Sequence, residues 1–120
     1  MIKYIFTASF EKDFKRLLKK FRTLEEDLKV AKRDAIELYH LLKIDNESIE
    51  VMPGFCNYEI LICKLRKFSC KALKGRGNKS GIRIIYAYHI ATQTVNFIEI
   101  YFKGEKEKGD SVRIKEYLRK

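Results

Sequence analysis

The hydrophobic and polar positions at the start of the chain predict a short strand followed by an amphipathic helix. Residues 2–6 are mainly β-branched or aromatic, a composition that favours a strand. The apolar residues that follow recur at helical spacing: Phe10, Phe14, Leu17, Leu18 and Phe21. This spacing places them on one face of a helix, for which Thr7 or Ser9 is the expected N-cap. We therefore expect the apolar stripe to face the core and the lysines beside it to face solvent.

A second helix is predicted to begin almost at once. The residues Thr23-Leu24-Glu25-Glu26 have the spacing of a capping box, in which the hydroxyl and the last carboxylate each accept a bond from the other residue's amide. The buried face is expected to contain Leu24, Leu28, Ala31, Ala35, Leu38 and Leu42. This helix should end near Ile44, before a run of polar residues. Two helices joined by so short a link are expected to pack antiparallel as an αα-hairpin.

The periodicity changes from helix to strand in the second half of the chain. Residues 58–68 alternate, with Ile60, Ile62, Lys64 and Arg66 expected on one side and Leu61, Cys63, Leu65 and Lys67 on the other. Residues 82–90 and 94–103 predict two further strands joined by a hairpin. Residues 71–81 combine three glycines with four basic residues and predict a mobile basic loop.

The order of these elements predicts the fold class. Residues 49–54, which contain the single proline, are expected to connect the helices to the strands, and Asp110 or Ser111 to cap a short final helix. The pattern indicates an α+β fold, with a short N-terminal strand and an αα-hairpin packed on a small twisted antiparallel sheet. A length of 120 residues, of which 46% are hydrophobic, is typical of one domain covering residues 1–120.

The chain shows no signal for export or for a membrane. No apolar stretch reaches the roughly 18 to 20 residues that span a bilayer, and residues 1–6 acquire a charge too early for a signal peptide. We therefore expect a cytoplasmic protein with reduced thiols at Cys56, Cys63 and Cys70. Their spacing of seven is not that of zinc ligands, and residues 71–81 lack the phosphate-loop pattern. Neither a metal nor another cofactor is expected.

Positive charge is concentrated in one part of the sequence. Between Glu59 and Tyr88 there are eight basic residues and one acid, a net +7 out of the +10 of the whole chain. The eight are Lys64, Arg66, Lys67, Lys71, Lys74, Arg76, Lys79 and Arg83. Such a surface suits a polyanion, because every phosphate it neutralises releases counterions. The alternative is a solvated face that only maintains solubility.

Four segments, in order along the chain, share a pattern with a known family. They are Phe10-Glu11-Lys12-Asp13-Phe14, Cys63-Lys64-Leu65-Arg66, Lys79-Ser80-Gly81-Ile82-Arg83-Ile84-Ile85-Tyr86 and Phe97-Ile98-Glu99-Ile100-Tyr101-Phe102-Lys103-Gly104. The first is similar to the opening helix of the RelE/ParE superfamily of bacterial toxins, and the second to its K-x-R strand. The third resembles its S-G-x-R-ϕ-ϕ-Y strand, where ϕ is apolar, and the fourth its last strand, which ends in a base.

The resemblance implies the toxin component of a type II toxin–antitoxin system, paired with a cognate antitoxin protein. In the RelE branch the toxin is an endoribonuclease (an mRNA interferase) that cleaves mRNA on the ribosome, and this branch keeps the basic strand residues, as this chain does. Two alternatives stay open: a ParE-like inhibitor of DNA gyrase and a non-catalytic RNA-binding relative. A basic surface of this kind also suits an acidic or amphipathic antitoxin segment that folds across it.

The resemblance also assigns roles to individual residues. Arg83 corresponds to the family's strand arginine, which contacts the scissile phosphate. Lys64 and Arg66 correspond to the basic pair of the preceding strand, and Lys103 to the base that ends the last strand. The C-terminal tyrosine of some relatives has no counterpart here except Tyr117, which matches poorly. The group that protonates the leaving oxygen is therefore left open.

The residues themselves suit RNA cleavage without a metal. The 2′-hydroxyl attacks its own phosphate, and the planar guanidinium of Arg83 can pair with two oxygens of the phosphorane that forms. Lys64 or Lys103 could act as the base, because crowded cations favour a neutral amine, while Arg66 binds phosphate. Glu99 is a second candidate base, with an ion pair to a strand arginine as its structural alternative.

Aromatic and loop residues complete the expected site. Tyr101 could stack on an unpaired base, whereas Tyr86 and Tyr88 alternate with Arg83 and are expected in the core. The residues expected to contact the RNA backbone are Lys67, Lys71, Lys74, Arg76 and Lys79. The nuclease hypothesis requires that Arg83 faces outward and that carboxylates from the helices do not neutralise its neighbours.

Overall fold

A five-stranded mixed sheet organises the chain, and the computed structural model describes residues 1–119. The strand order is β1-β5-β4-β3-β2, with bounds β1 (Lys3–Phe6), β2 (Ile49–Val51), β3 (Ile60–Leu65), β4 (Ile82–His89) and β5 (Thr94–Phe102). β1 is parallel to β5, whereas all other neighbours are antiparallel. The prediction of a purely antiparallel sheet is therefore wrong at this edge. β1 and β5 are distant in sequence, so no hairpin fixes their relative direction.

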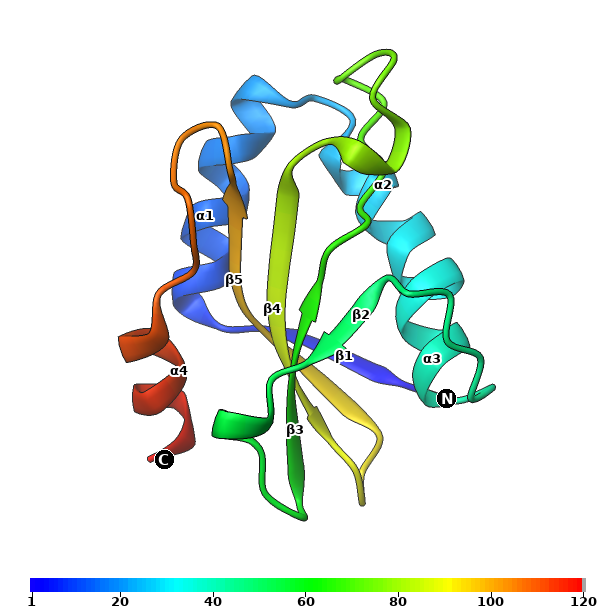
Figure 1. The fold of residues 1–120 in the computed structure, drawn as a ribbon. Coiled ribbons are helices and arrows are strands. Elements are labelled where there is room, and N and C mark those ends of the chain that lie inside the picture. Colours follow the sequence, from blue (N-terminus) through cyan, green and yellow to red (C-terminus); the bar gives the residue numbers. More distant parts are fainter. Residues whose placement is uncertain (120) are drawn as a thin grey trace.

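The helices follow the predicted order with different ends. Their bounds are α1 (Ala8–Lys20), α2 (Leu24–Ala31), the π-helical segment η1 (Lys32–Glu37), α3 (Leu38–His40) and α4 (Ser111–Leu118). Figure 1 shows the chain rising through α1 and returning through α2 to α3, so the two helical segments run in opposite directions. The second helix ends at His40 rather than near Ile44, and Lys43 has a φ of 59°, which a continuing helix does not allow. No helix within residues 1–119 is long and apolar enough to cross a membrane.

The caps of the helices explain where α1, α2 and α4 begin. The Thr7 hydroxyl accepts a bond from the Phe10 amide, and the Asp110 carboxylate caps α4 through the amides of Val112 and Arg113, both as predicted. The predicted capping box at Thr23 is wrong. Its hydroxyl donates to Asp27 Oδ2 at 2.7 Å and caps no amide of its own helix.

The two faces of the sheet bury different clusters. On one face, the apolar stripe of α1 and residues of α2 and η1 pack on side chains such as Leu65, Ile84 and Tyr86. On the other, Ile114 of α4 packs on Ile62, Ile85, Ala87, Ile98 and Tyr101. The predicted alternation along residues 60–65 is therefore confirmed, because Ile62 and Leu65 belong to opposite clusters. We call the second surface the α4 face.

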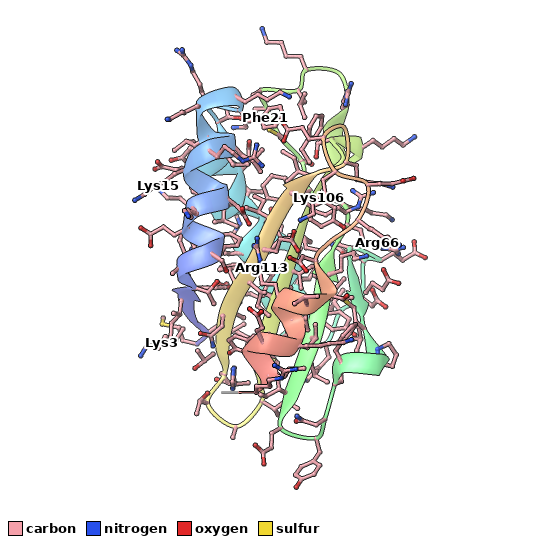
Figure 2. All side chains as sticks on the ribbon, turned by 90° about the vertical axis from the view of Figure 1, so that its left-hand side faces the viewer. Lys3, Lys15, Phe21, Arg66, Lys106 and Arg113 are labelled. Carbon is pink, nitrogen blue, oxygen red and sulfur yellow. The ribbon has the colours of Figure 1, made fainter. Side chains whose placement is uncertain are left out.

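One side of the α4 face remains open because α4 covers only part of it. The Arg113 guanidinium holds this helix against α1 through Asp13 at 2.5 Å and also donates to the Ile98 carbonyl. Figure 2, which looks onto α4, shows Lys106 and Arg66 beyond the N-terminal end of the helix. The candidate site lies in this open part.

Candidate nucleic-acid interface

Four cationic side chains and one glycine line a hollow of about 350 Å³ at the open end of the α4 face. They are Arg66, Lys67, Lys79, Gly81 and Arg83, and we call this the cationic hollow. Arg83 lies on β4 between Ile82 and Ile84, both of which are buried under the helices. By alternation its side chain therefore points to the α4 face, away from α1 and α2. The structure thus brings together four of the basic residues that the sequence analysis selected.

The Arg83 guanidinium is positioned by a single hydrogen bond. Its Nη1 donates to the carbonyl oxygen of Arg66 at 2.7 Å, across the gap between β4 and the end of β3. No carboxylate among residues 1–119 forms a salt bridge with Arg83. A guanidinium carries five N–H donors, so most of them are left to bind an anion in the hollow.

Weak ion pairs accompany the two residues that follow β3. Arg66 lies 3.8 Å from a Glu50 oxygen and Lys67 lies 3.8 Å from a Glu47 oxygen, and all four side chains are substantially exposed. Pairs of this kind contribute little stability and are easily exchanged for another anion. Lys67 also lines a hollow on the helix side, beside Asp27, because β3 ends at Leu65 and alternation is no longer enforced.

The turn that precedes Arg83 is fixed by its own sequence. Ser80 is fully buried, and its hydroxyl donates to the Phe68 carbonyl at 2.5 Å while accepting from the Ile82 amide. Gly81 has a φ of 84°, a conformation that suits glycine, and its carbonyl accepts from the Lys103 amide. Ser80 and Gly81 therefore close the basic loop at the point where β4 begins.

The other end of the same loop is tied to α2. The buried carboxylate of Asp27 accepts from the Lys71 amide at 3.3 Å and from the Thr23 hydroxyl. That hydroxyl in turn accepts from the Ala72 amide at 2.9 Å. Sequence reasoning assigned Thr23 to a helix cap and overlooked Asp27. An acid on the buried face of α2 was the available signal.

Replacing Asp27 should loosen this end of the loop. We expect Asp27→Ala to lower the free energy of unfolding by about 1–3 kcal/mol, because it leaves the Lys71 amide and the Thr23 hydroxyl without their acceptor. Urea unfolding measures the loss, and hydrogen exchange at residues 71 and 72 should accelerate. Glu26→Ala, next to it but exposed, is the control and should change neither quantity by much. Equal hydrogen-exchange rates at residues 71 and 72 in both variants would contradict the proposal that Asp27 holds this end of the loop.

The remaining loop residues lie outside the cationic hollow. Lys71, Lys74 and Arg76 are exposed on the loop between Phe68 and Ser80, and they do not line the hollow. Lys103 is exposed directly after β5, beside Gly81. These positions extend the positive surface around the hollow without forming part of its wall.

The structure places Glu99 and Tyr101 beneath the segment that follows β5. A β-bulge pairs Ile85 with Glu99 and Tyr86 with Phe97, so the face of the strand changes at Ile98. Strict alternation along residues 97–101 would place Glu99 on the same face as Phe97 and Tyr101, but because of the bulge it shares a face only with Tyr101. Both Glu99 and Tyr101 are almost fully buried, at 1% and 3% exposure.

The partners of these two residues exclude most of the roles predicted for them. Glu99 pairs with Lys106, not with a strand arginine, and its other oxygen accepts from the Asp110 amide at 2.8 Å. Tyr101 lies under the Lys106 ammonium, and burial raises the pKa of its hydroxyl. Its ring offers no open face for stacking on a base, and the Glu99 carboxylate is already engaged by two donors.

Sequence reasoning missed the segment that covers Glu99. Lys106 and Lys108 come from a run of alternating charges after β5, which reads as an ordinary solvated turn. Gly109 shows how closely this segment packs on the sheet. A Cβ at this position would lie 2.5 Å from Ile85 Cδ1 and 3.1 Å from Glu99 Oε1. A larger residue at this position would therefore have to displace the ends of the Ile85 and Glu99 side chains.

Within residues 1–119, no group of three or more His, Cys, Asp or Glu side chains is arranged to hold a metal ion. Comparisons of this chain with protein-family models, with curated proteins and with solved structures find no match.

Proposed function

We propose that this chain is a toxin of the RelE type, a metal-independent endoribonuclease that cleaves mRNA on the ribosome. The observation that carries the proposal is the cationic hollow, in which Arg83 faces outward on a rigid strand with no carboxylate of residues 1–119 paired to it. The sequence resemblance supports the same reading. The proposal includes a cognate antitoxin, whose acidic or amphipathic segment would cover the hollow.

The hollow suits the phosphate whose ester bond is cleaved. When the 2′-hydroxyl attacks the adjacent phosphorus, a pentacovalent phosphorane with additional negative charge develops. Arg83 is held through one N–H and would present the others to the phosphoryl oxygens, while Arg66 and Lys79, which line the same hollow, add positive charge. The bond to the 5′-oxygen then breaks, which leaves a 2′,3′-cyclic phosphate on one fragment and a 5′-hydroxyl on the other.

The residues around the hollow favour lysine over glutamate for the proton transfer. Glu99 is engaged by Lys106 and by the Asp110 amide, and it lies under the covering segment. Lys64 is half-buried on β3, two residues before Arg66 and on the same face. We assign Lys64 as the candidate proton acceptor, with Lys103 at the opposite side of the site as the alternative.

The test is to map RNA ends in a translating extract with and without the protein. The proposal expects new 5′-hydroxyl ends within coding sequences and matching 2′,3′-cyclic phosphate ends upstream. A DNA strand of the same sequence should stay intact, because it lacks the attacking hydroxyl. Intact mRNA together with inhibited DNA supercoiling would contradict the proposal and favour a gyrase inhibitor.

A further inference from the structure

A second hollow of about 270 Å³ lies on the same face and differs from the first in chemistry. Its lining includes the apolar side chains of Met52, Ile85 and Ile114, and the polar side chains of Lys64, Lys108 and Ser111. We call it the mixed hollow. The proposed cleavage chemistry uses only Lys64 from this set and gives no role to the apolar part.

The two hollows are neighbours on the same pair of strands. Lys64 of the mixed hollow lies on β3, two residues before Arg66 of the cationic hollow, which directly follows the strand. Ile85 and Arg83 are two residues apart along β4. Two residues of an extended strand cover about 7 Å. A single nucleotide spans a comparable distance between its phosphate and its base.

The chemistry of the mixed hollow matches a nucleobase better than another phosphate. Met52 is only partly buried and supplies apolar contact for a flat ring, while the Lys108 ammonium and the Ser111 hydroxyl can donate to the oxygen and nitrogen atoms of that ring. A purely anionic ligand would gain nothing from the apolar surface. Resting on the proposed function, we infer that the mixed hollow binds one unpaired nucleobase of the RNA strand whose phosphate occupies the cationic hollow.

This occupant makes the protein selective for single strands. A base inside a duplex is stacked and paired, so it must leave the helix before it can enter a pocket. The wall formed around Gly109 keeps the mixed hollow closed on one side, since this residue lies against Ile85. A duplex could place its phosphates on the cationic hollow but could not fill the mixed one.

The experiment compares two uncleavable oligomers on the intact protein. One is a short 2′-O-methyl oligouridylate, and the other is a base-free sugar–phosphate oligomer of the same length and charge. Fluorescence anisotropy at low salt should show that the wild-type protein binds the first roughly tenfold or more tightly, the range expected for the contact of one base. Ser111→Phe, which fills the mixed hollow from the exposed start of α4, should lower this preference to near one.

Val112→Phe is the matched control, because this neighbour is exposed and does not line the hollow. It should keep the wild-type preference. Equal binding of both oligomers by the wild-type protein would contradict base binding in the mixed hollow but would still agree with phosphate binding in the cationic hollow. This comparison uses the wild-type protein alone, so it does not depend on the folding of a variant. A preference that survives in a folded Ser111→Phe protein also contradicts base binding in the mixed hollow. Failure to bind either oligomer overturns the proposed RNA-directed function itself.

Discussion

Arg83→Ala is expected to slow RNA cleavage by about 10²- to 10³-fold, the loss typical of removing one preorganised donor from a developing anion. Of the two arginines that line the cationic hollow, Arg66 is paired with Glu50, whereas Arg83 forms no salt bridge with any carboxylate of residues 1–119. Arg83→Lys should recover only part of the rate, because an ammonium keeps the charge but not the planar pair of donors. The rate at which new mRNA ends appear in a translating extract measures both variants.

The stability of the protein should be nearly unchanged by the same substitution. Arg83 is half-exposed, and it contributes one hydrogen bond to a carbonyl at the surface. Arg33→Ala is the matched control, since it removes one arginine charge from the exposed side of η1, on the helix side of the sheet. It should cleave at the wild-type rate. Full activity of a folded Arg83→Ala protein would remove the central element of the proposed mechanism.

Acidification from about pH 6.5 to pH 4 is expected to destabilise the fold by up to about 3 kcal/mol through His40 alone. This imidazole is buried against Tyr88, with its Nε2 2.7 Å from the Tyr86 hydroxyl. Burial lowers its pKa from an ordinary value of 6.5 to about 4. Between these two values the unfolded chain binds a proton that the folded chain excludes, so stability falls as the pH falls and levels off below about 4.

Urea unfolding at a series of pH values, compared between wild type and His40→Gln, isolates this contribution. Carboxylates titrate in both proteins, so the difference between the two curves reports His40. The wild type should lose its advantage over the variant as the pH drops. His89→Gln is the control, because His89 lies beside Tyr117, away from His40, and its substitution leaves the surroundings of His40 intact. Parallel curves for wild type and His40→Gln would contradict the expectation.

Local patterns predicted β1, β3, β4 and β5 and the orientation of Arg83, because alternation is a property of a few consecutive residues. They missed β2, since residues 49–54 were expected to form only a connector. The burial of Ile82 and Ile84 under the helices is enough to turn Arg83 to the opposite face. The direction of β1 was not predictable in this way, since its partner β5 is distant in sequence. The bulge beside Glu99 was also missed, because one unpaired residue shifts the alternation without any local signal.

The residues of the candidate site that come from neighbouring strands were predicted, whereas those that come from segments distant in sequence were missed. Arg83 lies on β4 and Arg66 directly follows its neighbour β3, and the pairing of these two strands brings the two residues together. Asp27 and Lys108 reach the site region from a helix and from the segment after β5, and only tertiary packing brings them there. The sequence contained only weak signals for these contacts: the acid Asp27 on the apolar face of α2, and Gly109 within a run of charged residues.

The basic loop is attached at both ends, so changes within the loop can occur separately from changes in the strand that follows it. Its ends are held at Ser80 and at Asp27, so residues can be inserted or exchanged between them without moving the strand that carries Arg83. If the proposed function holds, the loop tip can change to suit a different ribosomal or RNA surface while the position of Arg83 is retained. Under that proposal, the choice of target and the rate of cleavage would depend on separate parts of the sequence.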